Sequence, residues 1–422
     1  MARQPLHVPP GSHCSTSALH VSLCVRLIAW KAWLLAVCSS AIACRAGATA
    51  SLEDFEARLA CPTELHTTQI QRDLRPWNLS AELGYPIQRE YLDKLFASHT
   101  CLVRILLYKR EVYIRTSDTS CINSVENAAL HAGRFFDVLL AADIELPDVE
   151  LLLNVRDRPV APLHEPAPIF STWTTSAHSD VPFPDPRRLD EAADSCAAVN
   201  GPSATPFEER SDRLLFRGAL SGATQEEPMH THSFALMPRA RLMLLGERYP
   251  KLFDVGLTQG NPEAGAPPEL RSNPAFLEFW RRHRRPFLPQ AQWSRYRFLA
   301  VVDGVSGASR LACALLSGSV VFKQTSPYYA WFERWLDPGV HFVPFAYDMS
   351  DLVAQIAIAR ERTDSMRIIS RQATERMRQF FSFPAMLCYL ARLLTAYHDT
   401  LGFTPGPPDP AEGWRRIGGT AA

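Results

Sequence analysis

Two short stretches of the sequence combine arginine with small residues in a way that suits anion binding. They are "FRG" at 216–218 and "DGVSGASR" at 303–310. Glycine and serine let the backbone approach a phosphate group closely, and arginine is always charged and can bind two phosphate oxygens at once. Together they describe a diphosphate site. On spacing alone, ordinary strand-to-helix turns with surface arginines are the better explanation, since neither stretch is a GxGxxG or Walker motif.

A third stretch, "NVRDRP" at 154–159, places Asp157 directly after an apolar run. A carboxylate at such a point can act as the general base that removes a proton from an incoming hydroxyl. The alternative is an aspartate that caps a helix or pairs with Arg156 or Arg158, and the residues alone favour it. His341 is interpreted as a packed or hydrogen-bonded histidine. No Cys/His cluster has zinc spacing, so no metal site is predicted.

After residue 207, the elements that must position these residues alternate between strand and helix. Strands are predicted over 213–218, 252–258, 296–304, 319–324 and 340–345. Helices are predicted over 234–247, 274–284, 308–316, 328–336, 349–361, 364–380 and 384–398, with Asp348 or Ser350 as the cap of the helix at 349–361. This alternation predicts parallel sheets with helices on both faces, in which ligands bind at the carboxyl ends of the strands.

Before residue 207 the predicted elements are more mixed. They are a helix at 52–60, a β-hairpin over 101–117 that turns near Lys109, a helix over 122–142, a buried strand over 149–155 and a strand over 167–173. The segment 181–207, rich in proline and charge, is the predicted linker. The predicted fold class is therefore α/β with two domains, 51–207 and 208–400, that face a cleft. The last helices belong to the second domain, and 401–422 form a flexible tail.

The composition is that of a packed globular protein long enough for two domains. The chain has 422 residues, of which 46% are hydrophobic and 21% charged, and 44 Lys and Arg balance 44 Asp and Glu. No net charge favours binding to nucleic acid or to an anionic membrane surface. Residues 1–50 are predicted to be a secretory signal peptide cleaved after Ala50, or an uncleaved anchor, because basic residues precede an apolar stretch and small residues follow it.

Cysteine usage agrees with an oxidising compartment. The cysteines after the leader are Cys61, Cys101, Cys121, Cys196, Cys313 and Cys388. An even number of them predicts disulfides, although Cys313 lies in an apolar helix and is predicted to be a buried free thiol. The sequon at Asn78 is a predicted glycosylation site for a luminal chain.

At these same stretches the chain resembles glycosyltransferase family 90. This is the capsule-associated type, which includes protein O-glucosyltransferases and KDEL-motif-containing proteins. The matching segments are 146–159, 168–186, 214–222, 249–258 and 296–352, and the last keeps the family's order and spacing throughout. The resemblance covers roughly residues 84–400.

The resemblance implies two Rossmann-like domains of the GT-B type, the first on the acceptor side and the second binding a UDP-sugar. The implied activity moves glucose or xylose from the UDP-sugar to a hydroxyl of a protein or glycan acceptor, with inversion and with no metal or other cofactor. Asp157 would be the general base. The donor would be bound by Arg217, Gly218, Gly304, Ser309 and Arg310, and the two arginines would stabilise the charge that develops on the diphosphate.

The resemblance also implies a disulfide between Cys61 and Cys388, and a second between Cys101 and Cys121. The protein would work in the lumen of the endoplasmic reticulum or Golgi, or be secreted, with contact to a membrane only through an N-terminal anchor. The segment "PRRLDEAADS" replaces an aromatic-rich part of the family. That departure leaves the acceptor open, and it motivates the alternative of a luminal binding protein without transfer activity. A nicotinamide-dependent enzyme is disfavoured because no GxGxxG follows a strand.

Overall fold

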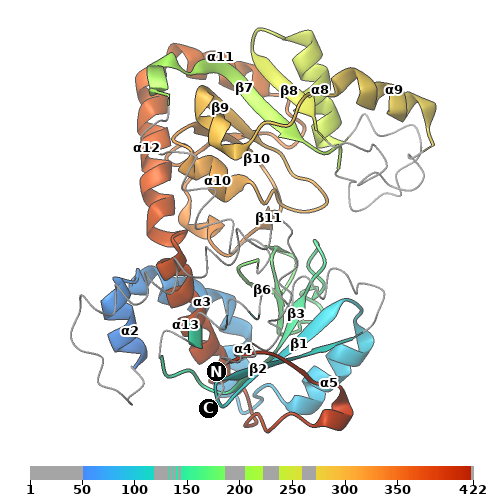
Figure 1. Ribbon diagram of the computed structural model, residues 1–422, viewed down its shortest axis with the longest axis vertical. Coiled ribbons are helices and arrows are strands. Elements are labelled where there is room, and N and C mark those ends of the chain that lie inside the picture. The colour runs from blue at the N-terminus through green and yellow to red at the C-terminus, as the bar shows by residue number, and fades with distance from the viewer. Residues whose placement is uncertain are drawn as a thin grey trace, which may run out of the picture. The chain divides into compact units, whose positions relative to one another are not determined.

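The computed structural model describes residues 51–117, 133, 136, 139–140, 144–185, 205–221, 237–258 and 272–419. The predicted leader, most of the predicted helix over 122–142, most of the predicted linker, Cys121 and Cys196 lie outside them. From Ser51 onward the chain forms one compact unit that contains two larger sheets and a two-stranded ribbon (Figure 1). The predicted boundary at 207/208 therefore stays a prediction.

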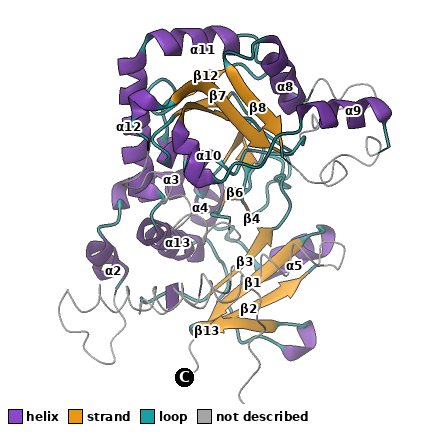
Figure 2. Cartoon of the chain, turned by 45° about the horizontal axis from the view of Figure 1, so that its top comes forward, coloured by secondary structure: helices purple, strands orange, loops and turns teal. Residues whose placement is uncertain are grey.

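The described part of the second half contains a parallel sheet in the order β12-β10-β9-β7-β8. Its strands are β7 (Ser211–Gly218), β8 (Phe253–Leu257), β9 (Tyr296–Val301), β10 (Val320–Gln324) and β12 (Val343–Phe345). Figure 2 labels the strands β12, β7 and β8. The α/β class and all five predicted strands are confirmed. β8 and β9 lie on opposite sides of β7, so the strand order reverses between β7 and β9. Ligands of open α/β sheets bind at such a switch point, outside the carboxyl ends of the strands.

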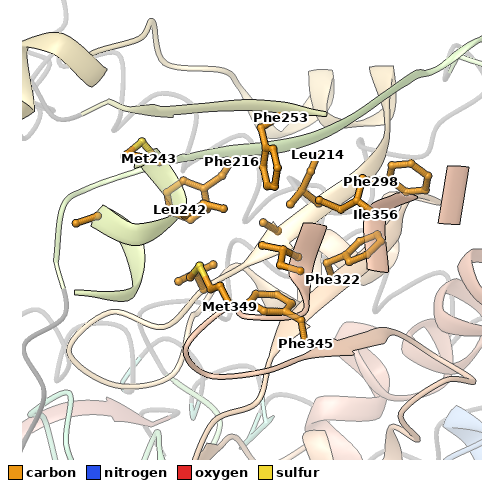
Figure 3. Close-up of a cluster of buried hydrophobic side chains, with 14 of the residues drawn as sticks. Leu214, Phe216, Leu242, Met243, Phe253, Phe298, Phe322, Phe345, Met349 and Ile356 are labelled. Atoms are coloured by element: carbon orange, nitrogen blue, oxygen red, sulfur yellow. The ribbon is translucent and has the colours of Figure 1, made fainter. Parts of the chain in front are cut away.

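Helices cover this sheet and bury its apolar side chains. They are α8 (Pro238–Arg248), α9 (Pro274–His283), α10 (Leu311–Leu316), α11 (Leu352–Glu361) and α12 (Thr363–Phe380). Leu214 and Phe216 alternate along β7 and share one face, where they join Phe322 and Ile356 in a buried cluster (Figure 3). Burying one such side chain contributes roughly 1.5–3 kcal/mol. This core fixes β7 and with it the direction of each residue at its carboxyl end.

A mixed sheet in the order β13-β2-β1-β3-β4-β6 combines five strands of the first half with β13 from the end of the described chain. Its strands are β1 (Leu102–Tyr108), β2 (Glu111–Thr116), β3 (Val149–Asn154), β4 (Ile169–Ser171), β6 (Val181–Pro182) and β13 (Arg415–Gly419). The predicted hairpin is confirmed. Lys109 and Arg110, with φ of 47° and 64°, form its two-residue turn, and so short a turn makes β1 and β2 antiparallel. Only β3, β4 and β6 run parallel, so this sheet is less Rossmann-like than predicted.

The first and last helices of the described chain pack together beside the mixed sheet. They are α2 (Leu52–Leu59), α3 (Thr63–Asp73), α4 (Arg75–Glu82), α5 (Arg89–Ser98) and α13 (Phe383–His398). α13 packs against α2, α3 and β3, and the predicted disulfide between Cys61 and Cys388 is confirmed. Arg392 of α13 also pairs with Glu56, at 2.6 Å from Nε to Oε1. α13 thus packs on the mixed sheet, although the prediction placed it in the second domain.

The end of the described chain is ordered, and the prediction of a flexible tail is wrong for residues 401–419. β13 pairs with β2 in antiparallel register, and Glu412 lies 3.3 Å from the guanidinium of Arg89. The physical reason is that an edge strand such as β2 has backbone groups left to pair. β13 supplies the missing partner, and no hydrophobic pattern in its own sequence announced it.

Three smaller predictions also differ from the structure. The predicted helix at 328–336 is replaced by β11 (Tyr328–Tyr329), which pairs with β5 (Thr174–Thr175), and by a single 3₁₀ turn at Glu333–Trp335. Neither Asp348 nor Ser350 caps α11, since the Asp348 carboxylate instead accepts a hydrogen bond from the Ser350 backbone N–H at 3.0 Å. Cys313 is disulfide-bonded, as is Cys101, so the predicted free thiol is wrong. The pairing of Cys101 with Cys121 stays a prediction.

Within the described ranges, no single helix is long and apolar enough to cross a membrane. One pair, 363–380 with 384–398, passes that test together by length and composition but is bent by 54° between its two halves.

Candidate functional site

The structure brings Gly218 and Arg310 together at the carboxyl end of β7. The Arg310 guanidinium lies over the ring of Phe216, with Cζ 4.6 Å from the ring centroid, and its Nη1 donates a hydrogen bond to the carbonyl oxygen of Arg217. A Cβ at position 218 would lie 2.5 Å from Arg310 Nη2. Glycine therefore makes room for the guanidinium. α10 begins at Leu311, directly after Arg310, and has six residues.

Gly304 lies against a second arginine, Arg239, which was not among the residues predicted from the sequence. A Cβ at position 304 would lie 2.9 Å from Arg239 Nη2 and 3.0 Å from Ser221 Oγ. Ser309 is exposed on the same loop. The loop that follows β9 therefore packs directly on the side chain of Arg239, which comes from the first turn of α8.

Arg239 fastens two strand-end loops to one another. Its Nη1 donates to Ala219 O at 3.1 Å and to Ser221 Oγ at 2.6 Å, and its Nε and Nη2 donate to Val302 O at 3.3 and 3.1 Å. Only 7% of the residue is exposed. Burial lowers the pKa of Arg239 to about 10, so the group remains charged at neutral pH.

Two guanidinium groups thus share the ring of Phe216. Arg239 Cζ lies 5.7 Å from its centroid and Arg310 Cζ lies 4.6 Å from it. None of the hydrogen-bond acceptors of Arg239 is a carboxylate. The Asp303 carboxylate is near enough to raise the pKa of Arg239, and two guanidinium groups on one ring suit the binding of an anion. One signal in the sequence could have indicated Arg239: a basic side chain in the first turn of a helix is electrostatically unfavourable unless something else holds it.

Arg217 lies on the other face of β7. Its Nη2 pairs with Asp254 Oδ1 at 2.5 Å and its Nη1 donates to Asp254 O at 2.7 Å. Tyr296 donates to the same carboxylate at 2.6 Å. Successive strand residues point to opposite faces, so the Arg217 side chain is directed away from Phe216 and Arg310. Arg310 donates a hydrogen bond to the backbone carbonyl of Arg217. Binding of a UDP-sugar by the Arg217 guanidinium stays a prediction.

Asp157 is exposed in the turn that follows β3, and a buried asparagine shapes that turn. Asn154 Nδ2 donates to Arg158 O at 2.7 Å, and Asn154 Oδ1 accepts from the backbone N–H of Arg156 at 2.9 Å. Asn154 also donates to Ser171 Oγ on the neighbouring strand, at 3.1 Å. The turn is therefore fixed from beneath, while the Asp157 carboxylate is left accessible.

A contact joins the segment after β4 to the loop of Gly304 and Arg310. A Cβ at Gly307 would clash with the ring of Trp173, so the indole lies directly on that backbone. Trp173 follows β4, which pairs with β3 at Asn154 and Ser171. The carboxyl ends of β3 and β4 therefore adjoin the loop that carries Arg310.

Two further predictions concern histidine and metal. The Nδ1 atom of His341 accepts a hydrogen bond from the Asp337 backbone N–H at 2.8 Å, which confirms the hydrogen-bonded interpretation. Within residues 51–419, as far as they are described, no group of three His, Cys, Asp or Glu side chains is placed to hold a metal ion. Independence from metal stays a prediction.

Comparison of the sequence with known proteins identifies the family of this chain. The sequence model described as glycosyl transferase family 90 matches residues 56–413. The chain belongs to that family. The match includes the parallel sheet, the mixed sheet except for β13, and every residue predicted for catalysis or donor binding. It also includes Asn78, half-buried on α4, where glycosylation stays a prediction.

Individual relatives carry names consistent with the family. Protein O-glucosyltransferase 3 of Rattus norvegicus is 27% identical over 61% of this chain and 48% of its own length. Protein O-glucosyltransferase 1 of Homo sapiens is 23% identical over 84% of each protein. The chain thus spans about half the length of the first relative. The structure of Anabaena Alr3699/HepE in complex with UDP and glucose overlaps with TM-score 0.30 at 14% identity, over 44% of this chain and 48% of that one. This is too weak to bear on fold or ligand.

Proposed function

We propose that this family 90 protein transfers a sugar, glucose or xylose, from a UDP-sugar to a hydroxyl of a protein or glycan acceptor. The observation that carries the proposal is the pair of guanidinium groups, Arg239 and Arg310, on the ring of Phe216 at the β7/β9 switch point. That position is where open α/β sheets bind ligands, and the pair suits a diphosphate. The names of the relatives support glucose.

In this proposal the donor diphosphate lies against the two glycines that leave room for the arginines. Arg310 binds phosphate oxygens, assisted by the backbone at Gly218 and Gly304 and by the hydroxyl of Ser309. Arg239 positions both loops and adds a buried positive charge. Such fixed cations stabilise the charge that grows on the diphosphate as its bond to the sugar breaks, which is the task a metal ion performs in other enzymes.

Asp157 is the proposed general base. Its carboxylate takes the proton of the acceptor hydroxyl as the hydroxyl oxygen forms a bond to the anomeric carbon. The bond from that carbon to the diphosphate oxygen breaks at the same time, and its electron pair leaves on UDP. A single in-line displacement needs one base and inverts the anomeric configuration, so no second carboxylate is required.

The proposed setting is the lumen of the endoplasmic reticulum or Golgi. Cys61 and Cys388 form a disulfide. Cys101 and Cys313 each take part in a disulfide as well. Structural disulfides persist in oxidising compartments and are rare in the cytosol. The cysteines therefore support passage through the secretory pathway, and glycosylation at Asn78 would accompany it.

The test is a screen for UDP release by the purified protein. The donors are UDP-glucose, UDP-xylose, UDP-galactose and UDP-N-acetylglucosamine, each with and without EDTA. We expect slow release, unaffected by EDTA, from UDP-glucose or UDP-xylose. Clear binding of UDP with no release from any donor, even with acceptor proteins and glycans supplied, would contradict transfer and favour a luminal binding protein.

A further inference from the structure

Three polar residues surround the carboxyl ends of β9, β10 and β12 and take no part in the mechanism above. They are Asp303, Tyr328 and Tyr347, and two other side chains hold them in place. The amide of Gln324, 1% exposed, accepts from Asp303 N at 3.0 Å and donates to Tyr347 O at 2.7 Å. Ser326 Oγ donates to the Asp303 carboxylate and accepts from Tyr328 N at 3.0 Å. This scaffold fixes the three residues beside the loop of Arg310.

The hydroxyl of Tyr328 is buried and can still donate and accept a hydrogen bond. Only 7% of the residue is exposed, and its hydroxyl has no hydrogen-bond partner among the described residues. A buried hydroxyl without a partner is destabilising, so native proteins rarely leave one unsatisfied. The Nε atom of Arg158, next to Asp157 in the chain, is buried and likewise without a partner among those residues.

The carboxylate of Asp303 has a chemistry that does not suit the diphosphate itself. It lies directly before Gly304 and is 8% exposed. Burial raises its pKa to about 6, so it is mostly ionised at neutral pH and has no proton to donate to a phosphate oxygen. An ionised carboxylate only accepts hydrogen bonds, whereas a tyrosine hydroxyl both donates and accepts. Together they match a ligand rich in hydroxyl groups.

We infer that Asp303 and Tyr328 bind hydroxyl groups of the sugar in the donor, beside the arginines that bind its diphosphate. The inference rests on the proposed function and adds to it which residues bind which part of the donor. Arg239 and Arg310 act on the diphosphate, which UDP and a UDP-sugar share, whereas Asp303 and Tyr328 bind the sugar, which only the UDP-sugar carries. Loss of either residue therefore weakens UDP-sugar binding selectively.

The test compares dissociation constants, measured by calorimetry, for UDP and for each of the four UDP-sugars. The proteins are wild type, Asp303→Asn, Tyr328→Phe and the control Asp364→Asn, whose carboxylate is 90% exposed on α12. We expect UDP affinity to stay within about twofold in all of them. The UDP-sugar that wild type binds most tightly should bind about tenfold or more weakly to Asp303→Asn and about threefold or more weakly to Tyr328→Phe.

Equal weakening of UDP and UDP-sugar, or no weakening of either, would overturn the inference and leave the proposed function standing. A wild-type protein that binds neither UDP nor any UDP-sugar would instead contradict the proposed function, and the inference with it. Tyr328→Phe removes one oxygen and keeps the ring, so this variant decides the question even if Asp303→Asn fails to fold.

Discussion

At the scale of single residues, the site depends on where charges are held and on which of them are compensated. Arg217 forms an ion pair with Asp254 within the sheet, whereas Arg239 donates hydrogen bonds only to carbonyl and hydroxyl oxygens and interacts with the Asp303 carboxylate from a greater distance. The buried charge of Arg239 can therefore attract an anionic ligand to this part of the sheet. The two arginines therefore differ in what they can offer a ligand, although Arg217 alone was predicted from the sequence.

Replacement of Asp157 by asparagine tests the proposed base. Asparagine keeps the shape of the side chain but cannot take up the acceptor proton, and loss of a general base typically costs about 10²–10⁴-fold in rate. We expect turnover to fall by that order while the dissociation constant for UDP, measured on the same protein, does not change. Turnover close to that of wild type would remove Asp157 from the mechanism.

A methyl group at Gly218 tests the packing of Arg310. In Gly218→Ala the new Cβ would lie 2.5 Å from Arg310 Nη2 and displace the guanidinium, so UDP affinity should fall by about tenfold. Gly406→Ala is the matched control, because a Cβ there meets no atom within 4 Å. If the two variants bind UDP equally well, UDP binding does not depend on the position of the Arg310 guanidinium.

At the scale of elements, the sequence was informative wherever local pattern decides structure. The apolar runs of β7 to β10 and the hairpin at Lys109 were predicted with small errors at their ends. The partners of these elements were not predictable in the same way. The pairing of Arg217 with Asp254 depends on β8 lying next to β7, and β13 depends on a free edge of β2. The contact of Arg239 with two loops depends on the whole sheet, so only its unfavourable place in α8 hinted at a role.

The junction of α3 and α13 contains a buried histidine that should make stability depend on pH. His66 is fully buried near the rings of Trp335 and Tyr389, each with its centroid 5.5 Å from that of the histidine. Burial, and secondarily the charge of Arg392, lower its pKa to about 4. The unfolded chain therefore takes up a proton at higher pH than the folded chain. The contribution of neutral His66 to the free energy of unfolding is complete above pH 6.5 and is lost as the pH falls to about 4.

The variant His66→Phe isolates this effect, because phenylalanine fills the site without titrating. Between pH 7.5 and pH 4, wild type should lose about 3 kcal/mol of unfolding free energy relative to the variant. Burial raises the pKa of Asp73 to about 6, so Asp73 adds stability as the pH falls. This effect is the same in wild type and variant and cancels in the comparison. Urea unfolding at several pH values measures the difference, and parallel pH curves would refute the assignment.

At the scale of the whole described chain, the two sheets are linked by the path of α12 and α13. α12 packs against α10 and β10 of the parallel sheet, and α13 packs against α2 and α3 beside the mixed one. Residues separated by 327 positions are then joined by the bond between Cys61 and Cys388. The resemblance to the family predicted this bond, whereas no residue pattern alone could have chosen its two cysteines among six.

The double variant Cys61→Ser, Cys388→Ser tests that link. Removing a disulfide that closes so long a loop should lower the unfolding free energy by about 2–5 kcal/mol. The ion pair of Arg392 with Glu56 remains, so the fold should survive at 25 °C. Thermal and denaturant unfolding of wild type and variant measure the effect. A difference below about 0.5 kcal/mol would show that packing of α13 alone holds the two ends together.

The most direct measurement is the affinity of UDP for wild type and for Arg310→Ala, determined by calorimetry with Arg281→Ala as the control. Arg281 is a mostly exposed arginine of α9. If Arg310 binds the diphosphate, loss of its charged hydrogen bonds should weaken UDP binding by about tenfold or more, and the control should match wild type. Unchanged affinity in Arg310→Ala would contradict a donor site at the β7/β9 switch point.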